Sequence, residues 1–145
     1  MPKPGEKTIP KLAMVGILGL LLVVALVWEY RRTQPVRGAV RSFSALVTAA
    51  NRGEIETVRE LCSQNYLRTH RLEKAPEGGV VGFPRNIHKN FQTWTRDSEV
   101  WICSGNRLGP VYRMIPERGR WVFDGLEGFL NSDSSGGPTL MRGEP

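Results

Sequence analysis

An uncharged apolar run near the amino terminus constrains this chain more than any other feature. Leu12 to Trp28 reads LAMVGILGLLLVVALVW, seventeen residues without a charge. As a helix rising about 1.5 Å per residue, the run spans about 25 Å, close to the hydrocarbon thickness of a bilayer at about 30 Å. The run is apolar on every face and is bounded by charges. The sequence therefore predicts a transmembrane helix over residues 12–30 rather than a buried core helix.

The residues that flank this run are typical of a membrane interface. Lys and Arg are frequent beside membrane spans, and Trp and Tyr gather at the level of the lipid headgroups. Membrane lipid, bound through residues 12–30, is therefore the first partner we expect. The residues expected to contact the interface are Lys11, Trp28, Tyr30, Arg31 and Arg32.

A cleaved signal peptide shares the basic start and the apolar run, and it is the alternative to an anchor. Its apolar region is normally about 7–15 residues long and is followed by small residues at the cleavage site. The run here is longer and ends Val-Trp-Glu-Tyr-Arg-Arg, which favours an uncleaved, single-pass anchor. Basic residues on the two sides of the run nearly balance, so charge does not set the orientation. We expect the commoner arrangement for such chains, with the soluble domain outside the cytoplasm.

The net charge of +6 is concentrated around the apolar run. Residues 1–38 carry a formal +4, whereas residues 39–145 carry +2. A protein that binds nucleic acid through its phosphates needs a basic surface on its folded domain. We therefore expect no nucleic-acid partner.

The rest of the chain divides into a tail, a linker, a domain and a second tail. Residues 1–11 form the amino-terminal tail, and Pro35 and Gly38 indicate a linker over residues 31–38. Residues 39–130 are long enough for one small soluble domain. Residues 131–145 are rich in Ser, Gly and Pro and have few apolar side chains, so they are predicted to be disordered.

Helical periodicity opens the domain. Phe43 and Val47 share one helical face, and Asn51-Arg52-Gly53 supplies a basic last turn and a glycine stop. A second helix is predicted from Glu54 to about Cys62, with Ser63 as the cap of a further short turn.

A third helix is predicted to begin at Pro84, a residue that suits a first helical position. Phe83, Ile87, Phe91 and Trp94 then recur at helical spacing. The glycine-bounded segment before it, Glu77-Gly-Gly-Val-Val-Gly82, is read as a short extended piece.

The remainder of the domain alternates as β-strands do. Residues 98–104, 110–115 and 120–124 each alternate, and Glu117-Arg118-Gly119 is predicted as a hairpin turn. Trp121 and Phe123 fall on the same face of the closing strand and are predicted to pack against the helices. The predicted fold class is α+β, with helices packed on a small antiparallel sheet of three or four strands.

Two segments carry a resemblance to a known superfamily. They are the opening helix pair from Phe43 to Tyr66, with its Asn51-x-Gly53-Glu-Ile-Glu56 turn, and the closing strand Gly119-Arg-Trp-Val-Phe-Asp124. The domain resembles the nuclear transport factor 2-like superfamily, the cone-shaped fold shared with ketosteroid isomerase and polyketide cyclase relatives. This resemblance implies a curved sheet closed by helices, with catalytic acids inside the cone in some relatives. Family members usually have a longer and more strongly bent sheet.

Few residues are candidates for chemistry. His88 lies in the densest polar cluster of the domain and is a candidate general base if a carboxylate orients it. The resemblance points to Asp124 as that carboxylate. The alternative is that His88 is on a solvent-exposed face and Asp124 begins a turn. Ligand-binding candidates in the same polar cluster are Arg85, Asn86 and His88.

Other motifs point away from a metal or cofactor. Cys62 and Cys103 are compatible with one disulfide or with two buried apolar residues. Their spacing, like that of the two histidines, does not suit zinc, and we expect no cofactor. An aromatic stacking platform is an alternative to core packing for four residues, Trp94, Trp101, Tyr112 and Trp121. The leading prediction is a non-catalytic, membrane-tethered binding module of unknown ligand. The alternative is a small enzyme with a ketosteroid isomerase-like pocket using His88 and Asp124.

Overall fold

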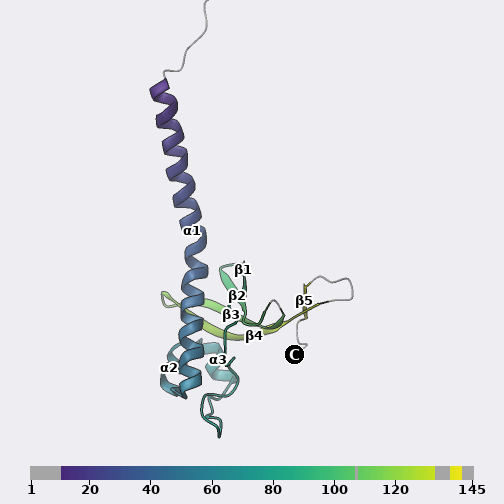
Figure 1. Ribbon diagram of the computed structural model, residues 1–145. Helices are drawn as coiled ribbons and strands as arrows, with labels where there is room; N and C mark the ends of the chain where they lie inside the picture. Colours follow the sequence, from purple (N-terminus) through teal and green to yellow (C-terminus); the bar gives the residue numbers. More distant parts are fainter. Residues whose placement is uncertain (1–10, 107, 133–137, 142–145) are drawn as a thin grey trace, which may run out of the picture. The chain divides into compact units, whose positions relative to one another are not determined.

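The computed structural model describes residues 11–106, 108–132 and 138–141, and it divides into two compact units, residues 1–34 and 35–145 (Figure 1). The second unit is α+β, as predicted. Its helices precede an antiparallel sheet. In chain order the elements are α1 (Lys11–Arg52), α2 (Ile55–Glu60), α3 (Gln64–Thr69), β1 (Gln92–Arg96), β2 (Glu99–Cys103), β3 (Gly109–Glu117), β4 (Arg120–Ser132) and β5 (Pro138–Met141).

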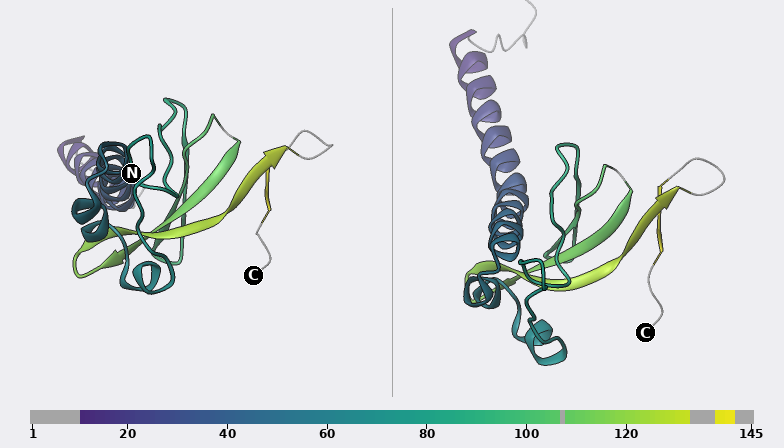
Figure 2. Two further views of the ribbon diagram at one scale, coloured as in Figure 1. Left: turned by 90° about the horizontal axis from the view of Figure 1, so that it is seen from below. Right: turned by 60° about the horizontal axis from the view of Figure 1, so that its bottom comes forward.

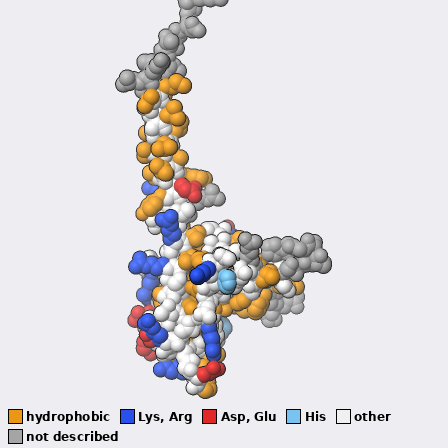
Figure 3. Space-filling model, viewed as in Figure 1, with side chains coloured by type: hydrophobic (Ala, Val, Ile, Leu, Met, Phe, Trp, Pro, Cys, Tyr) orange, Lys and Arg blue, Asp and Glu red, His pale blue; other side chains and the backbone are white. Residues whose placement is uncertain are grey.

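The first unit contains the apolar part of α1. Large apolar side chains from Met14 to Trp28 are between 50% and 70% exposed, and they line this part of the helix in Figure 3. The helix is long and apolar enough to cross a membrane, a property that signal sequences share. Such exposure is costly in water and favourable in lipid.

The predicted linker over residues 31–38 is wrong, because α1 runs through it with Pro35 inside the helix. A proline removes one backbone hydrogen bond from a helix interior. Two residues after Pro35 hold the helix against the domain. Val36 packs against the domain core, and Ala39 is fully buried within it. The domain therefore begins several residues earlier than the glycine at position 38 suggests.

The sheet is a meander in which neighbours in sequence are neighbours in space, in the order β1-β2-β3-β4-β5. All four pairings are antiparallel. The sheet has five strands rather than three or four. The two additional strands are β1, which the sequence predicts as part of a helix, and β5, which lies in the predicted tail. Figure 2 shows the curved sheet from two further directions, with β4 as the long yellow-green strand.

One face of the sheet, here called the inner face, packs against the helices of the domain. Phe43 and Leu46 of α1 and Val58 of α2 are fully buried against it. Phe123 at the centre of the inner face is 1% exposed, and its ring contacts those of Tyr66, Phe83 and Tyr112 at centroid distances of 4.9, 5.2 and 5.8 Å. This cluster is the main core, and the predicted helical stripe is confirmed.

The predicted caps are also confirmed. Gly53 follows the last residue of α1 with a φ of +70°, a left-handed conformation that glycine adopts without strain. Ser63 caps α3, and its Oγ accepts a hydrogen bond from the Tyr66 backbone N–H at 3.0 Å. Trp121 packs against the core as predicted, although it is only half-buried.

The predicted helix from Pro84 is wrong. Phe83, Ile87 and Phe91 do pack against the core, but from an irregular segment that leads into β1. Neighbouring elements satisfy part of its backbone. The Asn51 side-chain amide donates to the Arg85 carbonyl, and the His88 N–H donates to the Ser104 carbonyl at 2.8 Å. Tertiary contacts thus replace the hydrogen bonds that a helix makes internally.

The predicted disordered tail is partly wrong. Asn131 and Ser132 complete β4, and Pro138–Met141 pairs with β4 as β5. The tail's remaining residues, 133–137 and 142–145, lie outside the described part of the chain. Four residues with two apolar side chains are too few to give a periodic signal, and their pairing partner supplies the order.

Strand β4 contains two register shifts against β3. Phe123 pairs with Met114 and Gly125 with Arg113, so Asp124 between them has no partner opposite it. A second shift in the same strand leaves Glu127 without one. Such bulges bend a strand and redirect the side chain of the extra residue. In β4, both redirected side chains are carboxylates.

Candidate binding groove

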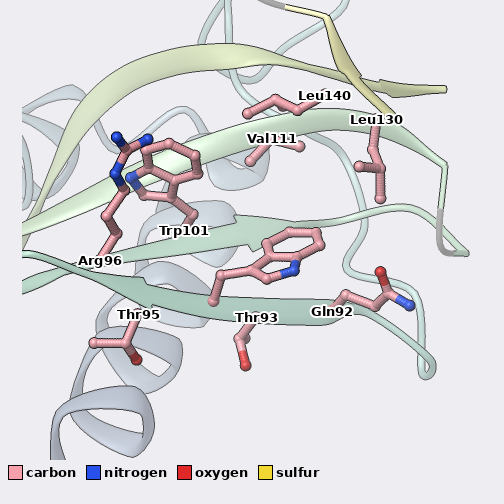
Figure 4. Close-up of a pocket in the computed structure, with 9 residues that line it drawn as sticks. Gln92, Thr93, Thr95, Arg96, Trp101, Val111, Leu130 and Leu140 are labelled. Atoms are coloured by element: carbon pink, nitrogen blue, oxygen red, sulfur yellow. The ribbon is translucent and has the colours of Figure 1, made fainter. Parts of the chain in front are cut away.

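The face of the sheet opposite the helices, here called the outer face, holds a groove of about 810 Å³. Strand alternation places Gln92, Trp94 and Arg96 of β1 on this face, and Thr93 and Thr95 also border the groove because β1 is the edge strand. Figure 4 shows Trp101, Val111, Leu130 and Leu140 on the same side, from four different strands. A second, smaller apolar cluster of Trp101, Cys103, Val111 and Leu130 forms its floor, against which Leu140 packs.

One end of the groove is aromatic and charged. Trp94 of β1 pairs with Trp101 of β2 across the two strands, and the two indoles are 37% and 8% exposed. The Arg96 guanidinium carbon lies 5.6 Å from the centre of the Trp101 ring, a cation–π arrangement. The Trp101 indole N–H donates to a Glu99 carboxylate oxygen at 3.1 Å. The buried indole of Trp101 is thus held by a hydrogen bond at its edge, while the more exposed indole of Trp94 forms a side of the groove.

The other end of the groove is apolar. Leu130 and Leu140 pair with each other in the β4–β5 register and form the far wall. Val111 is fully buried beneath the groove. A concave site with apolar walls and a few polar groups is the usual form of a ligand-binding site.

The two redirected carboxylates of β4 share one arginine. Arg113 Nη2 lies 2.7 Å from Asp124 Oδ2, and Arg113 Nη1 lies 3.3 Å from Glu127 Oε2. The other Asp124 oxygen accepts a hydrogen bond from the Ser63 hydroxyl. The Asp124 side chain is 7% exposed, so its charge is compensated inside the fold. Asp124 therefore links the cap of α3 to the bulge of β4.

The structure does not bring His88 and Asp124 together. His88 is exposed in the segment beside the end of β2, and its Nδ1 accepts from the Asn90 N–H at 3.2 Å. Asp124 lies on β4, with β3 between these two strands, and both of its carboxylate oxygens are engaged. Neither residue lines the groove.

The other sequence-predicted ligand residues lie elsewhere. Arg85 borders a smaller hollow of about 420 Å³ beside the glycine-rich segment, and its guanidinium lies 3.3 Å from the Glu77 carboxylate. Asn86 is exposed in the same irregular segment. Among the described residues, His, Cys, Asp and Glu side chains form no group of three suited to a metal ion.

The predicted membrane-interface residues all belong to α1. Trp28 and Tyr30 are 62% and 59% exposed, and Arg31 is also exposed. The side chains of Lys11 and Arg32 lie outside the described part of the structure.

The two cysteines are free, and each is buried on a different face of the sheet. Cys62 belongs to the main core, whereas Cys103 belongs to the outer cluster. Burial raises the pKa of the Cys62 thiol to about 12 and also raises that of Cys103. They are two buried apolar residues rather than a disulfide.

The four-residue aromatic platform is not formed. Trp94 and Trp101 line the groove, while Tyr112 and Trp121 pack in or against the main core on the inner face. The groove is not evident from the sequence, because β1 is predicted as part of a helix and Leu140 lies in the predicted tail. The alternation of Trp101 and Cys103 with Val100 and Ile102 was the available signal for a second apolar face.

Comparison of the chain with protein-family models, with curated proteins and with solved structures gives no significant match.

Proposed function

We propose that this protein is a membrane-tethered, non-catalytic binding module whose binding surface is the outer-face groove. The observation that carries the proposal is the pairing of an exposed indole, Trp94, with an apolar wall formed by Leu130 and Leu140 across one concavity. A soluble domain rarely leaves a tryptophan exposed beside an apolar hollow unless something binds there. Apolar groups, such as peptide side chains, are the ligand chemistry that suits these walls.

The tether is the apolar part of α1, retained in the mature protein, with the domain outside the cytoplasm. The length and composition of this segment support a membrane span, and the absence of small residues at a cleavage spacing after Trp28 supports its retention. Mass spectrometry of the membrane fraction should recover peptides from before Leu12. A mature amino terminus between Trp28 and Ala39 would show that the segment is a cleaved signal.

The groove is tested with the full chain in lipid nanodiscs, labelled with 5-fluorotryptophan. Its four tryptophans give four fluorine resonances, assigned by single Trp→Phe variants. Titration with N-acetyl-leucine amide should shift the resonances of Trp94 and Trp101. Trp121, against the core, is the internal control, and N-acetyl-glycine amide, which lacks an apolar side chain, is the control ligand.

Adjacent residues of β5 provide a matched pair of variants. Leu140 lines the groove, whereas Met141 points to the opposite face and is 59% exposed. Leu140→Asn should weaken binding about fivefold or more, since about 1 kcal/mol of lost apolar contact corresponds to that factor. Met141→Asn should leave it unchanged. Equal shifts at all four tryptophans, or equal affinity in both variants, would refute the groove as the binding site.

A further inference from the structure

Strand β1 is an open edge of the sheet. It pairs with β2 on one side, and no further strand bounds its other side in the described part of the chain. An edge strand presents unpaired N–H and C=O groups that can accept another strand. Trp94, Thr95 and Arg96 are exposed along it.

This edge has few of the usual protections. Natural edge strands are shielded by short length, by proline, by bulges or by charged side chains, and β1 has one charged side chain, Arg96. β1 reads Gln-Thr-Trp-Thr-Arg, and its five residues pair with β2 in unbroken register. The opposite edge, β5, begins at Pro138 and is only four residues long. Thr and Trp also favour strands, so β1 is well suited to accept a partner.

The sequence of β1 is close to a palindrome about Trp94. If two copies paired antiparallel about a two-fold axis at this residue, Trp94 would face Trp94 and Thr93 would face Thr95. Gln92 would face Arg96, so no like charges would meet. Aromatic pairs and Thr–Thr pairs are among the favourable cross-strand pairs, and like-charge pairs are unfavourable. A slip of one residue would place the inner face of one copy beside the outer face of the other.

From these observations we propose that β1 pairs with β1 of a second copy of this chain, joining two sheets edge to edge. The second copy would contribute to the binding site. All five residues of β1 line the groove, so the pairing sets β1 of the second copy directly beside it. The groove is then bordered by two tryptophans related by symmetry. This arrangement is isologous and closes at two copies.

One pair of five-residue strands buries much less than a standard interface of about 1,600 Å². Confinement of both copies to one membrane compensates by raising their effective concentration. The proposal therefore uses the membrane tether of the proposed function, but it does not depend on any ligand in the groove.

The test is disulfide crosslinking of the full chain in liposomes. One tagged copy carries Thr93→Cys, and a differently tagged copy carries Thr95→Cys. In the proposed register these positions are opposite each other, with Cα atoms about 5 Å apart, whereas two copies of position 93 are about 8 Å apart. Oxidation with copper phenanthroline should give about tenfold more of the mixed product than of either like product. The native thiols Cys62 and Cys103 are buried and are present in every sample.

Two controls make the result specific. Thr57, exposed on α2, gives a Thr57→Cys pair that reports random collisions in the membrane. At the two-fold axis, Trp94→Lys sets two like charges face to face and should lower the mixed product about tenfold, while Trp94→Phe keeps an aromatic pair and should retain it.

The proposal is overturned if mixed and like products form equally, if Thr57→Cys crosslinks as well, or if both Trp94 variants behave alike. Absence of crosslinking also overturns it, as expected if β1 receives an extended segment of a different protein. Groove binding has its own readout in the fluorotryptophan titration. A response there without crosslinking refutes only the pairing of copies, and the converse refutes only the groove.

Discussion

The two faces of the sheet use aromatic residues in opposite ways. On the inner face, Phe123 and Tyr112 are almost completely enclosed by other rings and by the helices. On the outer face, Trp101 is held at its edge by Glu99, and Trp94 remains 37% exposed above the groove. Burial on the inner face stabilises the fold, whereas Trp94 on the outer face leaves apolar surface in water, as the proposed binding function requires. Substitutions on the two faces should therefore separate stability from recognition.

The largest loss of stability is expected from a substitution of Phe123. Phe123→Ala removes the ring at the centre of the main core and leaves a cavity, so the free energy of unfolding should fall by about 3–5 kcal/mol. Leu126→Ala, on the same strand at a residue 53% exposed, should cost less than about 1 kcal/mol. His88→Ala, at another exposed position, should have a similarly small effect. Denaturant unfolding of the full chain measures all three, and equal effects at Phe123 and Leu126 would mean that the inner face is not the core.

Asp124 tests how much the polar link between α3, β3 and β4 contributes to stability. Asp124→Ala removes a partner of both Arg113 and Ser63, and should cost about 2–3 kcal/mol, less than a fully buried pair because Arg113 is 32% exposed. The control is Glu56→Ala, which breaks the exposed pair with Arg59 and should cost less than about 0.5 kcal/mol. Equal unfolding free energies for the two single variants would contradict the structural role of Asp124.

The parts of α1 that belong to the two units of the chain should differ in their response to a Gly→Ala substitution. A Cβ at Gly38 would lie 2.8 Å from Trp121 Cδ1, so Gly38→Ala should overpack the domain and cost about 1–3 kcal/mol. At Gly19 no atom lies within 4 Å, and Gly19→Ala should leave the domain's unfolding unchanged. Thermal unfolding followed by circular dichroism distinguishes the outcomes. A neutral Gly38→Ala would show that Trp121 does not pack against the helix.

Alkaline pH weakens the inner face through its buried acids. The pKa of Cys62 is raised from 9.0 to about 12 by burial, and that of Tyr66 from 10.0 to about 12, mainly by burial and also by the charges of Cys62 and Tyr112. Between pH 9 and 12 the unfolded thiol loses its proton while the folded thiol keeps it, so the unfolded state binds fewer protons. The free energy of unfolding should therefore be highest below pH 9. Above pH 9 the raised pKa of Cys62 should lower it by about 1 kcal/mol per pH unit. Cys62→Ala should flatten this slope, and an unchanged slope would exclude the thiol as its source.

Local patterns predicted the elements whose side chains decide their own structure. The stripe around Phe43, the glycine stop at Gly53 and the Ser63 cap each depend on residues within one or two turns. The sequence also predicted correctly that Tyr112 and Met114 share one face of β3, because the alternation of buried and exposed side chains can be recognised within a single strand. That the first part of α1 is long and apolar enough to cross a membrane follows from length and composition alone.

What the sequence did not predict depends on distant partners. Phe83, Ile87 and Phe91 have helical spacing, yet their backbone is satisfied by Asn51 and Ser104 from other elements. The order of β5 comes from pairing with β4, and the two bulges of β4 arise from its fit to β3. The groove joins residues from β1 to β5, so it could be recognised only after all five strands were placed.

The backbone hydrogen bonds between β4 and the segment that joins α2 to α3 have a consequence for synthesis of the chain. The Phe123 N–H donates to the Leu61 carbonyl, and the Ser63 N–H donates to the Phe123 carbonyl, both at 2.8 Å. The helices that need this strand leave the ribosome about 60 residues earlier, roughly 3–12 s at a rate of about 5–20 residues per second. During that interval the apolar faces of α2 and α3 have no sheet to cover them. The faces that α2 and α3 turn to the sheet can therefore be buried only after β4 has been made.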